Sequence, residues 1–231
     1  MIKTGYYIDK SDKLVKKLKK TLRRYDRRLS ARQGKEFSKT VQQKALAHFE
    51  ELIPTIPFYN AASYQEIILL NAQLIAIVRA MKDQGQTVED TMRIQVELLR
   101  EDWAKIPRFA GRIFTSRLGG LFLNRLAKKV TQEGWDTDYI RGTADDDFDI
   151  SIVTKKCGVV EYLKSEGMTD YLPYCNLSDF LMFPAMNIGL RQPSTIKNGQ
   201  CVYCMKYKGK SKIPSSLDII YGKNSDPSLR S

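Results

Sequence analysis

The sequence contains a single histidine, His48, among its 231 residues. Imidazole-based zinc sites and Ser-His or Cys-His catalytic relays need histidine beside other functional groups, so only a relay through His48 itself would survive. A glycine-rich phosphate-binding loop is also missing, because Gly119, Gly120 and Gly142 stand in neither a phosphate-loop nor a dinucleotide-binding pattern. The chain therefore lacks the residues on which histidine-based and nucleotide-binding enzymes depend.

Cysteine and long apolar runs are scarce as well. Four cysteines are too few for a disulfide scaffold in a chain of this length. The first residues, MIKTGYYIDKSDK, lack the apolar core of a signal peptide. We therefore expect a cytoplasmic protein with reduced thiols. The most apolar stretch, residues 67–81, is shorter than the about 20 residues that span a bilayer, so we expect a buried helix and no transmembrane segment.

Acidic residues are rare between Lys10 and Lys35. This segment holds 12 Lys or Arg and two acids, and it accounts for most of the net charge of +12. Apolar residues recur in it at steps of three and four, which predicts an amphipathic helix over 11–29. They are Val15, Leu18, Leu22, Tyr25 and Leu29. We expect this helix to pack its apolar stripe and solvate its basic face, with weak contact to an anionic membrane surface as the alternative. No nucleic-acid-binding motif accompanies the charge, so no nucleic-acid partner is expected.

Further helices are predicted over residues 36–52, 67–81, 87–103 and 109–130. His48 lies on the first of them and is expected to be structural. Ser63 is expected to cap the second, and Thr87-Val-Glu-Asp90 resembles a capping box at the start of the third. Gly119-Gly120 predicts either a weak point or a close packing contact in the fourth.

After Gly134 the pattern changes to short strands, predicted over 136–142, 148–153, 188–191, 200–208 and 216–221, with short helices over 159–166 and 178–182. The sequence therefore predicts an α+β fold, with an N-terminal helical bundle followed by an antiparallel sheet with short helices. We expect a basic amphipathic helix (1–35), a helical portion (36–132), an α+β portion that carries the cysteines (133–222) and a tail (223–231), with 36–222 as one compact domain.

All four cysteines lie between Asp146 and Tyr207. Asp179 follows Cys175 by four residues, so the two share a face if a helix starts there, and a carboxylate beside a thiol can serve acid-base and nucleophilic chemistry. The competing interpretation is that the cysteines are inert small core residues. Strand alternation places Cys201 and Cys204 on opposite faces, so a metal clip made by both would need a bulge or a turn.

Several features of this window occur in a recognisable order. A strand runs into Cys157 and is followed by a short helix. Next comes Cys175-Asn-Leu-Ser-Asp179, and then a Thr195-to-Gly199 turn that leads into a cysteine-bearing strand. In this order the window resembles the family of L-2-amino-thiazoline-4-carboxylic acid hydrolases and hydrolase-like proteins, with similarity over residues 37–208. The family's last cysteine is followed two residues later by an aromatic, as Cys201 is, whereas Cys204 fits the distance from the glycine turn better, so both stay open.

The resemblance implies a hydrolase that opens a cyclic amidine to an N-carbamoyl amino acid, acts on a small-molecule substrate and uses no cofactor or metal. It implies catalytic roles for Cys175 as nucleophile or ligand, Asp179 as acid or base, and Cys157. The expected substrate-binding residues are Arg191, Thr195, Cys201 and Cys204, and the Arg191 fork matches a substrate carboxylate. The alternative is a non-catalytic binding or sensing protein that uses the same cysteine pocket for a small ligand or for a metal, held by Cys157, Cys175 and one of the last two cysteines.

Overall fold

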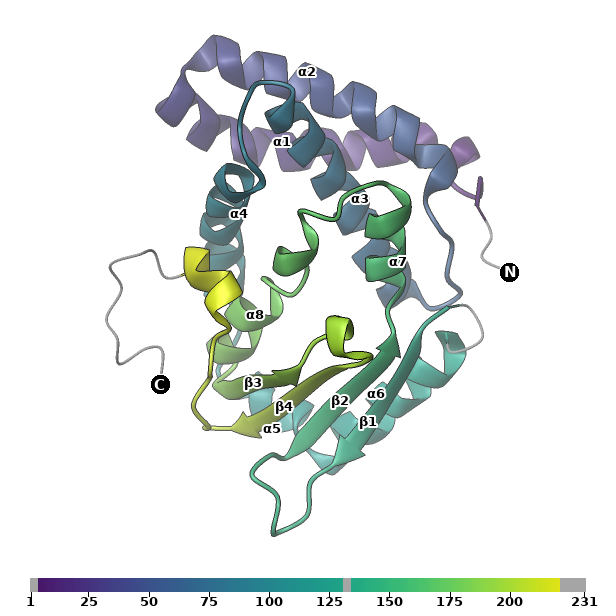
Figure 1. Cartoon of the computed structure of the whole chain (residues 1–231), viewed down its shortest axis with the longest axis vertical. Coiled ribbons are helices and arrows are strands. Elements are labelled where there is room, and N and C mark those ends of the chain that lie inside the picture. Colours follow the sequence, from purple (N-terminus) through teal and green to yellow (C-terminus); the bar gives the residue numbers. More distant parts are fainter. Residues whose placement is uncertain (1–3, 131–133, 221–231) are drawn as a thin grey trace. The chain divides into compact units, whose positions relative to one another are not determined.

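The computed structural model describes residues 4–130 and 134–220 (Figure 1). Helices come first along the chain and a four-stranded antiparallel sheet follows, so the predicted α+β fold is confirmed. The chain forms two compact units. The first unit comprises Met1–Gln95 with Val159–Leu172, and the second comprises Val96–Gly158 with Pro173–Ser231. Each unit is therefore built from two separate stretches of sequence.

The first unit consists of helices. They are η1 (Ile8–Lys10), α1 (Ser11–Gln33), α2 (Lys35–Leu52), η2 (Ile53–Thr55), α3 (Ala62–Lys82), the first half of α4 (Val88–Trp103) and most of α7 (Gly158–Ser165). Of these, α1, α2 and α3 are longer than predicted, while α4 and α7 lie within one residue of their predicted bounds. The predicted capping box of α4 is confirmed, because the Thr87 N–H donates to Asp90 Oδ2 over 2.9 Å and the Asp90 N–H donates to Thr87 Oγ1 over 3.2 Å. The predicted Ser63 cap is wrong, since α3 begins at the N-cap Ala61 with no side-chain cap.

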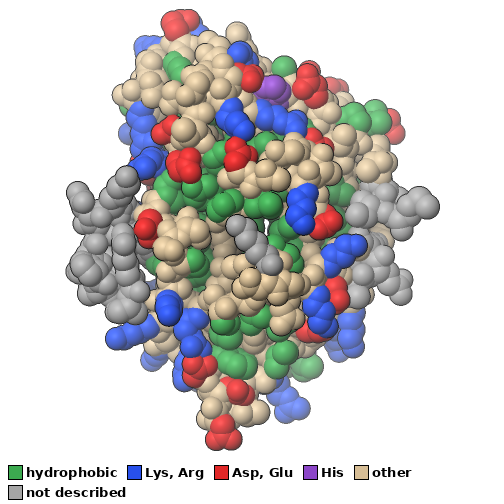
Figure 2. Space-filling model, in the orientation of Figure 1, with side chains coloured by type: hydrophobic (Ala, Val, Ile, Leu, Met, Phe, Trp, Pro, Cys, Tyr) green, Lys and Arg blue, Asp and Glu red, His purple; other side chains and the backbone are tan. Residues whose placement is uncertain are grey.

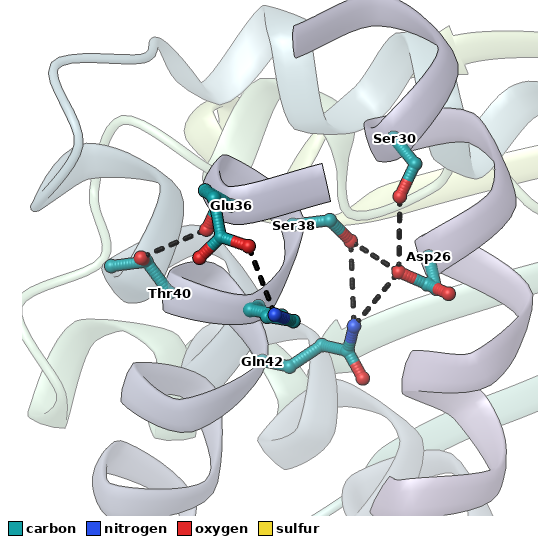
Figure 3. A network of polar contacts seen from close by, with 7 residues as sticks. Asp26, Ser30, Glu36, Ser38, Thr40 and Gln42 are labelled. Atoms are coloured by element: carbon teal, nitrogen blue, oxygen red, sulfur yellow. Dashed lines mark hydrogen bonds and ion pairs between the residues drawn. The ribbon is translucent and has the colours of Figure 1, made fainter. Parts of the chain in front are cut away.

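The basic helix α1 buries one apolar stripe and pairs with α2. The buried residues are Leu14, Leu18, Leu22, Tyr25 and Leu29, so Leu14 lies where Val15 was predicted, one residue earlier on the same face. Asp26, one of the two acids of this segment, accepts hydrogen bonds from Ser38 Oγ (2.6 Å) and Gln42 Nε2 (2.9 Å) of α2, and from Ser30 Oγ (3.2 Å) (Figure 3). A polar network thus joins the two helices beside their apolar contact.

The basic face of α1 is exposed, as predicted, and on the surface seen in Figure 2 Lys and Arg side chains are interspersed with Asp and Glu.

The single histidine, His48, pairs with an acid at the end of α3. His48 Nε2 lies 2.8 Å from Asp83 Oδ2, and this hydrogen bond holds the pKa of Asp83 below its usual range.

Arg79, which interrupts the apolar helix α3, forms an ion pair with Glu166, 87 residues further along the chain. Its Nη2 is 2.9 Å from Glu166 Oε2 and 2.8 Å from the Glu166 carbonyl oxygen. Thr55 Oγ1 donates to the other carboxylate oxygen, Oε1, over 2.6 Å. A second ion pair, Lys82 Nζ to Asp170 Oδ2 at 2.8 Å, lies one turn further along α3. These contacts anchor the segment Val159–Leu172 to the helices of the first unit.

The second unit contains the sheet and the helices that cover it. The strands are β1 (Asp136–Arg141), β2 (Ile150–Lys156), β3 (Ile188–Ser194) and β4 (Cys201–Tyr207), in the order β1-β2-β4-β3 with every neighbouring pair antiparallel. Ile150, Leu190 and Met205 pair across β2, β4 and β3 and are fully buried. In Figure 1, α6 (Arg117–Val130) lies against β1, and α8 (Asp179–Ala185) lies beside β3.

Two predicted elements of the second unit differ from the structure. The helix predicted over 109–130 divides into α5 (Ala110–Phe114) and α6, with the break before Gly119. A Cβ at Gly119 would collide with the carbonyl oxygens of Ile113 and Phe114, so the glycine provides the close contact predicted as one of two possibilities. The strand predicted over 216–221 is wrong, because Ser215–Ile220 forms the 3-10 helix η6. Residue 221 and the predicted tail lie outside the described residues.

We expect Arg79→Met to lower the free energy of unfolding by about 2–3 kcal/mol, because it leaves the partly buried Glu166 carboxylate without its cation. Urea denaturation measures the change. The matched control is Lys39→Met, which breaks the exposed Lys39–Glu36 pair of similar length and should cost less than about 0.5 kcal/mol. Equal, small losses in the two variants would contradict the anchoring role of Arg79.

Candidate functional site

The two faces of the central strand β4 separate its two cysteines. Cys201 pairs with Thr154 of β2 and Tyr203 pairs with Ile152, whereas Cys204 pairs with Ser151. Paired residues of antiparallel strands project on the same side of a sheet, and successive residues alternate. Cys201 and Tyr203 therefore share one face, and Cys204 lies on the other, as strand alternation predicted.

A bulge in β3 supplies a polar neighbour to Cys201. Arg191 pairs with Cys204 and Ser194 pairs with Val202, so β3 uses one more residue than β4 between these two pairs. Gln192, in the bulge, donates from Nε2 to Cys201 Sγ over 3.0 Å. Its Oε1 accepts from Asn176 Nδ2 over 2.8 Å.

Cys175 and Asp179 approach the same face from the loop before β3. Asp179 is the first residue of α8, and Cys175 precedes it in a turn after η4 (Leu172–Tyr174), so the two do not share a helical face as expected. The turn nevertheless brings these side chains close together, and the Cys175 thiol interacts electrostatically with Cys157, Cys201 and Asp179. The Tyr203 hydroxyl makes a hydrogen bond to the Asp179 carboxylate. These five side chains, Cys157, Cys175, Asp179, Cys201 and Tyr203, form the thiol–carboxylate cluster.

Burial sets the protonation of this cluster. It raises the pKa of Asp179 from 3.8 to about 6, against the opposing effect of the Tyr203 hydrogen bond. Burial also raises the pKa values of Cys175, Cys201 and Tyr203. The neighbouring Cys157, Cys201 and Asp179 raise the pKa of Cys175 further. At neutral pH the Cys175, Cys201 and Tyr203 side chains are therefore protonated, while Asp179 is mostly ionised and has its titration midpoint near pH 6. Asp179 is thus suited to take up and release a proton near neutrality.

Three residues expected at the site lie elsewhere in the second unit. Cys204 Sγ is 3.9 Å from Ser151 Oγ on the opposite face of the sheet from Cys201. Arg191 is in register with Cys204, and its Nη2 pairs with Asp147 Oδ1 at 2.5 Å, which holds the pKa of Asp147 below its usual range. Thr195 is exposed at the start of the turn that contains η5 (Ile196–Asn198). Of the two cysteines left open by the sequence, Cys201 is the one beside Cys175 and Asp179.

Sequence reasoning missed three residues of the site. Tyr203 could have been predicted, because strand alternation places it on the same face as Cys201, two residues earlier. Gln192 and Asn176 were not, since Gln192 lies in a bulge and Asn176 in an irregular turn. Asn176 is buried, and its Oδ1 has no hydrogen-bond partner among the described residues. A buried acceptor of this kind can receive a hydrogen bond from an N–H group of a ligand.

The cysteines of the cluster are thiols, and no disulfide links the four cysteines of the chain. In residues 4–130 and 134–220, no three or more His, Cys, Asp or Glu side chains are grouped so that they could hold a metal ion. A helix long and apolar enough to cross a membrane is likewise absent from the described residues.

No protein-family model matches the chain, and neither a curated protein nor a solved structure matches it. The chemistry of the cluster therefore has to follow from its own side chains.

The raised pKa of Asp179 predicts a pH-dependent cost of folding. The folded-state pKa lies above the ordinary value, so stability is fully present below about pH 4 and is lost as the pH rises through 6. Asp179→Asn removes this loss, and the variant should gain about 2 kcal/mol relative to the wild type between pH 4 and pH 7.5. Urea denaturation across this range tests it. Asp147→Asn is the control and should change with the opposite sign, since the pKa of Asp147 is lowered.

The raised pKa of Cys175 predicts a slow thiol, because only the thiolate is alkylated. At pH 8, iodoacetamide should modify Cys175 in the folded protein at least tenfold more slowly than it modifies glutathione. Peptide-resolved mass spectrometry follows each site, and the same protein in urea, where all four cysteines are accessible, provides the reference. A rate at Cys175 equal to that of glutathione would show an activated thiolate.

Proposed function

We propose that the thiol–carboxylate cluster is the active site of a hydrolase that opens a small cyclic amidine, such as 2-amino-thiazoline-4-carboxylate, to an N-carbamoyl amino acid. The observation that carries the proposal is Asp179, a carboxyl group with a pKa of about 6 that is hydrogen-bonded to Tyr203 and interacts with the thiols of Cys175 and Cys201. A general base for water near neutral pH needs a pKa in this range. The resemblance of residues 146–207 to the thiazoline hydrolase family supports the same reaction class.

The polar groups around the cluster complement an amidine. A cyclic 2-amino amidine presents N–H donors on one edge, and we propose that it donates to two acceptors, the Asp179 carboxylate and Asn176 Oδ1, which has no partner among the described residues. Asn176 Nδ2 donates to Gln192 Oε1, which leaves Asn176 Oδ1 as the free acceptor of this amide among the described residues. The protonated thiols of Cys175 and Cys201 are neutral and polarisable, so they suit the sulfur-containing ring. Arg191 has no part in this arrangement, because its register places it on the other face of the sheet.

The reaction needs one water and no other reactant. Asp179 takes a proton from water as the oxygen bonds to the amidine carbon, and the ring nitrogen takes up that proton to give a tetrahedral carbon. The bond from this carbon to the ring sulfur then breaks with its electron pair, the oxygen becomes a carbonyl as it loses its second proton, and that proton ends on the departing sulfur. Tyr203 stabilises the ionised form of Asp179 by its hydrogen bond and so keeps the carboxyl available as a base.

In this mechanism Cys175 contacts the substrate but does not attack it. Forming its thiolate would require a proton transfer to Asp179 against a pKa difference of several units. Cys175→Ser should therefore keep at least a tenth of the wild-type kcat. A loss of about a thousandfold or more, with a covalent adduct seen by intact-protein mass spectrometry, would instead assign Cys175 as the nucleophile.

The decisive experiment supplies the thiazoline and measures the ring-opened product. We expect Asp179→Asn to lower kcat/KM by about a hundredfold or more, the range of a lost general base. Tyr203→Phe should lower it about tenfold and move the acidic limb of the pH profile to higher pH, because the hydrogen bond that lowers the pKa of Asp179 is gone.

The matched control for this experiment is Cys204→Ala compared with Cys201→Ala. The two residues are on the same strand and differ in the face they occupy, so Cys204→Ala should leave kcat/KM near the wild-type value while Cys201→Ala lowers it. Full activity in Asp179→Asn, or equal effects of the two cysteine variants, would overturn the proposal.

A binding protein with the same cluster is the second candidate function, and the raised pKa values of Cys175 and Cys201 favour it because a protonated thiol is unreactive. It predicts that the amidine binds to the wild type in a calorimetric titration and is recovered unchanged.

A further inference from the structure

Helix α6 carries exposed apolar side chains on the side opposite to the face that it turns toward the sheet. The face toward the sheet carries Gly120, Asn124 and Ala127: a Cβ at Gly120 would lie 3.6 Å from Ile150 Cδ1, Asn124 Nδ2 donates to the Tyr139 carbonyl over 3.2 Å, and Ala127 is buried. The opposite face should be polar if it only meets water. It carries instead Leu118, Leu121 and Phe122, at the spacing of one helical face, and Leu118 is 78% exposed and Phe122 61% exposed.

The segment before α6 extends this exposed surface. Phe109 is 63% exposed and Ile113, four residues later in α5, is also exposed. We call Phe109, Ile113, Leu118, Leu121 and Phe122 the α5–α6 apolar surface. A single exposed Leu or Phe is ordinary on a folded protein. Five exposed apolar side chains within fourteen residues are unusual, and apolar exposure on this scale indicates an interaction site.

The charge around this surface has one sign. Residues 104–132 contain seven Lys or Arg and no Asp or Glu. Six of the seven have described side chains and all six are exposed: Lys105, Arg108, Arg112, Arg117, Arg125 and Lys128. The pattern of exposed aromatic and aliphatic side chains bordered by basic ones is typical of helices that lie in the interface of a membrane.

We propose that the α5–α6 apolar surface docks the protein on an anionic lipid bilayer. Its Leu and Phe side chains enter the boundary between headgroups and acyl chains, and the Arg and Lys side chains contact the anionic headgroups. A second copy of the chain is a poor occupant, because the same six exposed positive charges would face one another. A nucleic acid would neutralise the charge but would leave the apolar side chains in water.

This surface differs from the basic helix α1, for which weak contact with an anionic membrane surface was the alternative prediction. The apolar residues of α1 are buried within its own unit, so α1 offers charge alone. The α5–α6 surface offers charge together with exposed apolar side chains, and the combination gives more stable attachment than either alone. The proposal is independent of the reaction proposed for the thiol–carboxylate cluster.

The test is sedimentation of the full-length protein with vesicles of phosphatidylcholine alone and of phosphatidylcholine mixed with phosphatidylserine. We expect binding at least tenfold tighter to the mixed vesicles, and at least a tenfold loss of that binding in the double variant L118S/F122S. Both positions are exposed, so the variant should fold, and circular dichroism and thermal unfolding check this. The matched control is I67S/L70S, which removes two exposed apolar side chains from α3 and should bind as the wild type does.

A charge-reversal pair separates the two basic segments. R117E/R125E should reduce binding to the mixed vesicles at least tenfold, whereas K16E/K20E on α1 should reduce it by less than threefold. Failure of the wild type to bind the mixed vesicles would overturn the proposal, as would unchanged binding by L118S/F122S. A concentration-dependent dimer that dissociates in L118S/F122S, with no vesicle binding by the wild type, would assign the surface to a second copy and also overturn it.

Discussion

The ion pair between Arg79 and Glu166 holds an inserted segment of the chain on the helices of the first unit. The segment Val159–Leu172 belongs to the first unit, where Glu166 and Asp170 are held by two basic side chains of α3. Cys157 precedes this segment by two residues and Cys175 follows it by three. The chain returns to the second unit at both ends of this segment, and there Cys157 and Cys175 take part in one cluster.

Within the cluster, one physical effect acts on groups of different chemistry. Burial disfavours the ionised form of every acid, so it raises the pKa values of the thiols, the phenol and the carboxyl alike. The thiols and the phenol begin at or above pH 9 and move further from neutrality, whereas the carboxyl begins well below and moves toward it. The same environment thus makes three groups inert as acids or bases and one responsive. It also makes the folded state less stable than one with a neutral residue at position 179, a common cost of active sites.

The sequence predicted what depends on local pattern. Apolar spacing gave the helices of the first unit, the Thr87–Asp90 box gave the start of α4, and alternation separated Cys201 from Cys204. It failed where a long-range contact or an irregularity decides. Glu166 becomes the partner of Arg79 only in the folded chain, and Arg191 turns from the cluster because of its register with Cys204. Gln192 reaches Cys201 through a bulge, and residues 215–220 form a 3-10 helix where a strand was predicted.

The opposite faces of Cys201 and Cys204 have a consequence for redox chemistry. A C-x-x-C pair usually closes a disulfide, which needs Cα atoms within about 7 Å of each other. In an extended strand the Cα atoms of residues three apart are about 10 Å apart, and these two cysteines also project to opposite sides of β4. The pair cannot be oxidised to an internal disulfide while β4 stays paired with β2 and β3. The two thiols therefore react independently of each other, and a modification of Cys204 lies on the face of the sheet opposite to the thiol–carboxylate cluster.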